Sequence, residues 1–282
     1  MSLSSRSAIV TVSFCATAFL SPAIAWLPGT SPVFAPMARS EAAVPTVAPE
    51  MLVFPPDARP AMELVQKGLE RYRGTIRDYR CTFEKQEQLP DGMTPVQSID
   101  VRFREAPTSV FMVWTKNEDR VRRALYVDDP AFVDKQGAKV ARVEPAGAII
   151  RLVVSDVTLP IHGEQARTAS RRSMDEFGFG STLNLFWNIN TRAAREGDLK
   201  LWIDGDGVVA GRPTHIVIRH LPADYAKRGY PDARLVMHID KEWLLPVAVY
   251  QYADYAGKKL LASYVYRDVK LNPGFKDSDF KF

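Results

Sequence analysis

Cysteine is nearly absent from this chain of 282 residues, which has only two. Cys15 lies in an apolar run close to the N-terminus, so the rest of the chain holds Cys81 alone and cannot form an internal disulfide. Its stability must therefore come from a packed core, which this length permits. Cys81 shares a parity with Tyr79 and Phe83, and we interpret it as a small buried apolar residue rather than a reactive thiol.

The motifs that mark common enzymes and metal sites are also missing. The sequence has no G-x-S-x-G elbow, no P-loop and no H-E-x-x-H or Cys/His spacing, so neither a catalytic residue nor a metal or other cofactor is predicted. Asp204–Gly207 predicts a hairpin turn, because the later acidic ligands of a calcium loop are lacking. A catalytic triad can still assemble from distant residues. An envelope hydrolase that uses histidines therefore stays an alternative, with these candidates: His215, His220 and His238.

Long apolar runs are confined to the N-terminus. Arg6, an apolar stretch from Ala8 to Leu20 and the tripeptide Ala23–Ala25 predict a signal peptide over residues 1–25 that is cleaved after Ala25. The stretch is shorter than the roughly 20 residues that span a bilayer. No later segment reaches that length, so we expect an exported, periplasmic protein without a transmembrane segment in its mature chain.

Proline is concentrated directly after this segment, and residues 26–60 show almost no periodicity. They predict a flexible, disordered linker, followed by one domain over residues 61–282. The prolines of the linker are Pro28, Pro32, Pro36, Pro45, Pro49, Pro55, Pro56 and Pro60.

The formal charge is only +4, without a lysine-rich tail, so a nucleic-acid partner is not expected. Two arginine clusters are nevertheless present. We interpret them as solvated surface, with contact to anionic lipid head groups or an acidic partner as the alternative. The first comprises Arg120, Arg122 and Arg123, and the second Arg167, Arg171 and Arg172.

Period-two patterns dominate the remainder. Residues 79–88 and 99–104 each alternate apolar and polar side chains, while residues 109–114 are apolar on both parities. These patterns predict antiparallel strands, with a turn at Pro90–Gly92. Further strands are predicted within residues 125–143 and 199–266. Residues 149–154 fit either a strand or a helix, and residues 156–179 predict a broken polar loop with a short helix over Arg171–Phe177. The apolar face of this ribbon must be covered.

Two helices are predicted to cover it. The first has an apolar stripe from Met62 to Ile76 at steps of three and four residues. The second runs from Ser181 to Glu196, with Gly197 beyond its C-terminus, and its middle, LNLFWNI, is apolar on more than one face. The order of helices and strands indicates an α+β protein with an antiparallel sheet.

The C-terminal half carries motifs similar to those of an uncharacterised family of exported bacterial proteins, a domain of unknown function. They include Gly211–Pro213, Met237–Asp240, Leu245-Pro246 and Leu271–Phe275. The N-terminal ribbon, with Phe83, the glycine turn and the strand that ends at Trp114, resembles the start of the outer-membrane lipoprotein carrier family LolA.

That resemblance implies an open half β-barrel whose cavity holds acyl chains under a helical lid. The expected function is non-enzymatic binding or carriage of a lipid or lipidated protein, with an envelope protein as a further possible partner. The alternative is an envelope structural or interaction module with a filled core. The cavity lining predicted for the carrier is Phe83, Val101, Phe103, Met112, Trp114, Leu185, Phe186 and Trp187.

Overall fold

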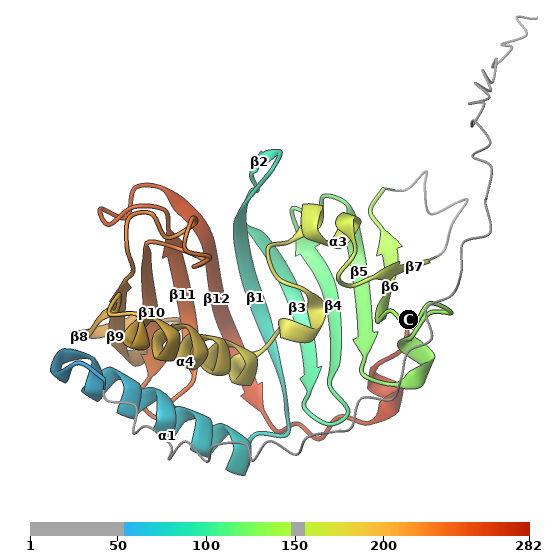
Figure 1. Cartoon of the computed structure of the whole chain (residues 1–282). Coiled ribbons are helices and arrows are strands. Elements are labelled where there is room, and N and C mark those ends of the chain that lie inside the picture. The colour runs from blue at the N-terminus through green and yellow to red at the C-terminus, as the bar shows by residue number, and fades with distance from the viewer. Residues whose placement is uncertain (1–53, 148–155) are drawn as a thin grey trace, which may run out of the picture. The chain divides into compact units, whose positions relative to one another are not determined.

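A sheet of 12 strands, all paired antiparallel, organises the part of the chain that the computed structural model describes, residues 54–147 and 156–282. Eleven of its strands follow the order β7-β6-β5-β4-β3-β1-β12-β11-β10-β9-β8, and the short β2 pairs with β1 (Figure 1). The edge strands β7 and β8 do not pair with each other within these ranges. The sheet is therefore open, and the expected α+β half-barrel is confirmed.

The two halves of the chain build the two halves of this sheet, which meet where β1 pairs with β12. The strands of the first half are β1 (Asp78–Leu89), β2 (Gly92–Met93), β3 (Gln97–Arg104), β4 (Ser109–Lys116), β5 (Val121–Val127), β6 (Val140–Pro145) and β7 (Val157–Pro160). Those of the second half are β8 (Lys200–Val209), β9 (Arg212–His220), β10 (Arg234–Asp240), β11 (Pro246–Tyr252) and β12 (Leu260–Leu271).

Because β7 and β8 lie at opposite edges, the chain between them must cross the sheet. This crossing contains α3 (Glu164–Ala169), the 3-10 turn η3 (Met174–Glu176) and α4 (Phe179–Arg195). Helix α1 (Arg59–Thr75) lies beside α4 on the same face (Figure 1). Residues 161–178, which we call the cover segment, continue over the half of the sheet that α4 leaves uncovered.

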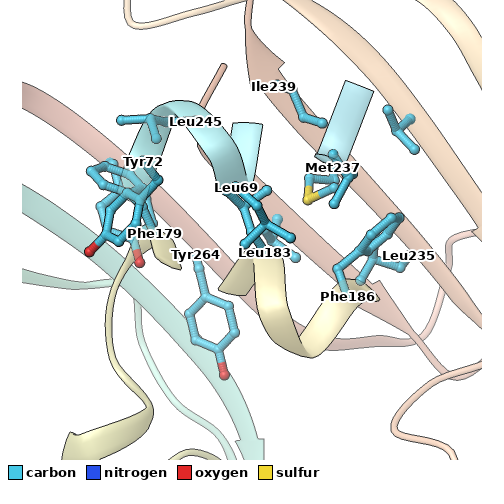
Figure 2. Packing of buried hydrophobic residues seen from close by; sticks show 14 of the residues in the cluster. Leu69, Tyr72, Phe179, Leu183, Phe186, Leu235, Met237, Ile239, Leu245 and Tyr264 are labelled. Carbon is cyan, nitrogen blue, oxygen red and sulfur yellow. The ribbon is translucent and has the colours of Figure 1, made fainter. Parts of the chain in front are cut away.

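The predicted stripe of α1 is buried, and it packs with α4 against the second half of the sheet. Leu69 and Leu183 lie between the two helices and the strands, beside Met237 (Figure 2). The approach of the helices is so close that a Cβ on Gly180 would lie 2.3 Å from Cε1 of Tyr72. Any larger residue at position 180 would push the helices apart.

Several boundaries differ from the predictions. The range predicted as linker ends in a 3-10 turn, η1 (Pro56–Ala58), and α1 already begins at Arg59. Of the strand predicted at residues 131–133, the first two residues belong to the 3-10 turn η2 (Pro130–Phe132), while Val133 forms an isolated antiparallel bridge with Lys139. The second helix begins at Phe179 rather than Ser181. Residues 156–179 contain short elements that carry too few residues for a visible period. The predicted signal peptide, most of the linker and residues 149–154 lie outside the described residues.

The predicted turn at Asp204–Gly207 is wrong. These residues lie within β8, where the pairing register shifts between Ile203 and Gly205. The turn follows at Ala210 and Gly211, which both have positive φ, as a two-residue hairpin turn of this kind requires. Glycines are tolerated in an edge strand where such a bulge interrupts the ladder.

Candidate functional site: a covered cavity

A cavity of about 430 Å³ lies between the sheet, α4 and the cover segment. Its walls are mostly apolar, and both halves of the sheet contribute to them. The apolar lining includes Ile99, Val121, Ala124, Ala141, Val143, Leu159, Ile189, Leu235, Met237 and Val249.

Five of the eight predicted lining residues lie on this cavity. They are Phe83, Met112, Trp114, Leu185 and Phe186. The other three, Val101, Phe103 and Trp187, do not line it.

The side chains of these three residues contact other residues of the chain instead of the cavity. Phe103 stacks on Tyr79 with ring centroids 4.8 Å apart, and Val101 is buried in the same core cluster. Trp187 meets the ring of Phe54 at 5.7 Å. Because Phe54 precedes the predicted domain, its contact with Trp187 could not be inferred from the helical period.

Aromatic rings close one end of the cavity. Phe177 of the cover segment meets Phe83 edge-on at 5.1 Å and also contacts Phe103 and Tyr266. Gly178 follows with a φ of 117°, and a Cβ there would lie 3.0 Å from the hydroxyl of Tyr79. The end of the cover segment is thus held tightly against β1 and β3.

A buried polar cluster lies on the cavity wall beyond these rings. The Glu87 side chain is fully buried and accepts hydrogen bonds from the Tyr264 hydroxyl (2.6 Å) and from Ser170 Oγ (3.3 Å). Lys85 Nζ lies 3.2 Å from the Glu87 carboxylate. Burial and the neighbouring Glu87 charge raise the pKa of Tyr264 well above its usual range, so its hydroxyl remains a donor.

The sequence contained a signal for this cluster that the prediction did not use. Lys85 and Glu87 continue the parity of Cys81 and Phe83, so they must face the covered side of the sheet. Two charged residues on an apolar face indicate a polar wall in an otherwise apolar space.

Arg219 carries a further buried charge of the wall. Its side chain is fully buried, and its guanidinium donates to both carboxylate oxygens of Asp232 at 2.8 and 2.9 Å. Gln251 Nε2 donates to the same carboxylate at 2.9 Å, and the guanidinium lies 5.6 Å from the centroid of the Phe186 ring. Charge compensation of this kind makes Arg219 part of the fold as well as of the lining.

The histidines named for a hydrolase contact different partners and lie outside the lining. His215 faces Asp206, His220 stacks on Tyr255, and His238 contacts Thr214. Among residues 54–147 and 156–282, no group of three potential metal ligands is found. Within the same ranges no helix is both long and apolar enough to cross a bilayer.

Fold and cavity together define an open half-barrel protein with a covered internal space. Residues 76–282 match the family described as "Protein of unknown function (DUF1571)", and the chain belongs to that family. The predicted membership in an uncharacterised family is thereby confirmed. No curated protein matches the chain.

Solved structures with a similar chain course include MucB, with 14% identity and a TM-score of 0.46. The similarity covers 80% of this chain and 63% of the MucB chain. Lipoprotein LppX of Mycobacterium tuberculosis has 14% identity and a TM-score of 0.42, with coverages of 78% and 99%. A putative outer membrane lipoprotein-sorting protein domain from Vibrio parahaemolyticus has 13% identity and a TM-score of 0.36, with coverages of 78% and 95%. Likenesses this distant carry no conclusion about ligands.

Proposed function

We propose that this protein is an exported, non-enzymatic binding protein whose cavity holds an acyl chain, either of a free lipid or of a lipidated protein. The observation that supports this most is the covered cavity of about 430 Å³ itself. Its volume lies within the range of about 300–1,000 Å³ that is typical of ligand pockets. An acyl chain in such a space gains roughly 0.8 kcal/mol for each methylene removed from water.

The alternatives receive less support. A filled core between sheet and helix would leave no cavity, whereas Phe83, Met112 and Trp114 line one. A histidine-based hydrolase requires its histidines to share a cleft, but His215 and His238 contact different partners outside the lining. The acyl-binding proposal uses the cavity directly.

Native mass spectrometry tests the proposal on the full chain, exported and purified without detergent. We expect copurified lipid, or uptake of palmitate after delipidation. In the variant Ala124→Trp, a large ring extends from the wall into the cavity, and we expect this variant to take up no palmitate. Ala141→Leu adds a smaller group to the same wall and serves if the tryptophan prevents folding.

Ala256→Trp is the matched control, because Ala256 is exposed in the turn after β11 and lies outside the lining. It should bind palmitate like the unmodified protein. A folded, delipidated protein that takes up no acyl chain, or a filled variant that binds as well as the control, would overturn the proposal.

A further inference from the structure

Two arginines of the cover segment lie on the cavity wall without a carboxylate partner among residues 54–147 and 156–282. Arg172 donates to the backbone oxygen of Glu176 (2.9 Å) and to Thr182 Oγ1 (3.4 Å). Arg171 reaches only the backbone oxygen of Pro231, at 3.5 Å. All of these acceptors are neutral, so the positive charges of both guanidinium groups are uncompensated by their contacts.

The buried cations of the wall differ in this respect. Arg219 is paired with Asp232, and Lys85 is paired with Glu87. At the rim, the guanidinium of Arg120 lies 2.7 Å from the carboxylate of Asp91. Cations are therefore matched elsewhere on the lining, and the excess of positive charge is concentrated at Arg171 and Arg172.

Both arginines are close to the polar cluster. The backbone N–H of Arg172 approaches Ser170 Oγ at 3.5 Å, and Ser170 in turn contacts Lys85 and Glu87. Nε of Arg172 is buried and has no partner among the described residues. An unsatisfied buried N–H on a charged group is costly unless a ligand atom satisfies it.

We propose that the cavity selects an amphiphile with an acidic head group, which Arg171 and Arg172 bind while the acyl chain extends past Phe83 and Met112. This inference rests on the proposed acyl-binding function and specifies its ligand. A guanidinium group can donate two parallel hydrogen bonds to a carboxylate or to a phosphate, so either head group fits these arginines. The carboxylate of Glu176, also on the lining, accepts from the Ser173 amide at 3.2 Å.

The position of the two arginines adds a consequence. They belong to the cover segment, whereas the apolar lining belongs mainly to the sheet and α4. An acidic amphiphile would therefore contact the cover through its head group and the sheet through its chain. Binding of such a ligand would hold the cover segment in place, which a neutral chain would do less well.

Calorimetric titration of the delipidated full chain with three ligands of equal chain length tests this inference. The ligands are palmitate, palmitoyl lysophosphatidic acid and the neutral monopalmitoylglycerol. We expect at least one acid to bind about tenfold or more tightly than the neutral ligand, as two charged hydrogen bonds allow. Whichever acid binds better identifies carboxylate or phosphate as the natural head group.

The double variant Arg171→Gln/Arg172→Gln should lose this preference and bind the neutral ligand unchanged. Its control is Arg71→Gln/Arg195→Gln, which removes the same charge from exposed positions on α1 and α4 outside the lining. Arg171→Gln alone serves if the double variant does not fold, because Arg171 is exposed and its side chain makes a single long hydrogen bond within the described residues, to Pro231.

Equal affinity for acids and neutral ligand in the unmodified protein would overturn the inference and leave acyl binding intact. A double variant that weakens all three ligands alike would also overturn it, because the arginines would then only support the fold. Failure of all three ligands to bind would instead remove the proposed function itself.

Discussion

The same sheet face is covered in two ways. In the packed region, which comprises Met62, Val65, Leu69, Leu183 and Ile239, the side chains of α1 and α4 meet the strands directly. In the cavity region, the cover segment spans the strands with a six-residue helix and a 3-10 turn, and a space of about 430 Å³ remains.

The difference follows from the length of the covering elements. Helices α1 and α4 have 17 residues each and present a continuous apolar stripe that fills the grooves of the sheet. A cover of short turns presents few apolar side chains and many polar backbone groups. It closes the space without filling it. Long helices thus supply stability in this fold, and the irregular cover supplies room for a ligand.

The largest expected effect concerns Arg219, which lies between the two regions. Arg219→Met leaves Asp232 buried without its partner, and we expect a loss of about 3–5 kcal/mol in the free energy of unfolding. Urea denaturation measures it. The double variant Arg219→Met/Asp232→Leu should recover most of this loss. The control variant Arg195→Met should change the free energy of unfolding little. A single variant within about 1 kcal/mol of the unmodified protein would contradict this account of the pair.

Truncation of one leucine and one methionine compares the regions directly. Leu183→Ala leaves a new void in the packed region, and we expect a loss of about 2–5 kcal/mol. Met112→Ala enlarges an existing cavity, so its loss should be clearly smaller than that of Leu183→Ala. Equal losses in urea titrations would indicate that the two regions are packed alike.

The pH dependence of stability tests the burial of the Cys81 thiol in the packed core. Burial raises the pKa of this thiol far above its usual value near 8.5. The unfolded chain therefore loses its proton first, and stability falls as pH rises above about 8.5, by about 1.4 kcal/mol per pH unit. Urea titrations at pH 8 and 9.5 measure the fall. Cys81→Ala should lack this component, and an identical fall in that variant would refute the assignment.

The smallest expected effect is on palmitate affinity, and it distinguishes two nearby residues of α4, Leu185 and Trp187. Leu185 lines the cavity although 41% of it is exposed, so Leu185→Ala should weaken palmitate binding by about 1 kcal/mol. Trp187 contacts Phe54 instead, and Trp187→Ala should leave the affinity unchanged. Calorimetric titration of both variants would show the opposite order if Trp187 reached the ligand.

Regular elements could be predicted from the sequence because their periods extend over many residues. The stripe of α1 and the alternation of β1 and β3 are examples, and both are found where the sequence placed them. Of the residues predicted to line a cavity, five lie on the one described and three do not. Phe103 has the correct parity, but it is covered by Tyr79 and Phe177, whose positions depend on tertiary packing.

The cover segment could not be predicted in the same way. Its elements α3 and η3 are six and three residues long, and their location over the first half of the sheet follows from the strand order, which local patterns do not reveal. Arg171 and Arg172 were recognised as a cluster, but solvated surface was the preferred interpretation. Their location on the cavity wall depends on how the cover segment folds back over the sheet, which places them near Ser170 and Glu87.

The pairing of β1 with β12 has a consequence for how the protein acquires its binding space. Each half of the sheet consists of hairpins between consecutive strands, which need only local contacts. The cavity draws its lining from both halves, and the pairing of β1 with β12 places residues such as Phe83 and Tyr266, far apart in the chain, opposite each other. A chain that lacks its last strand would keep many hairpins yet have no cavity. The capacity to bind therefore depends on this long-range pairing as well as on the local hairpins.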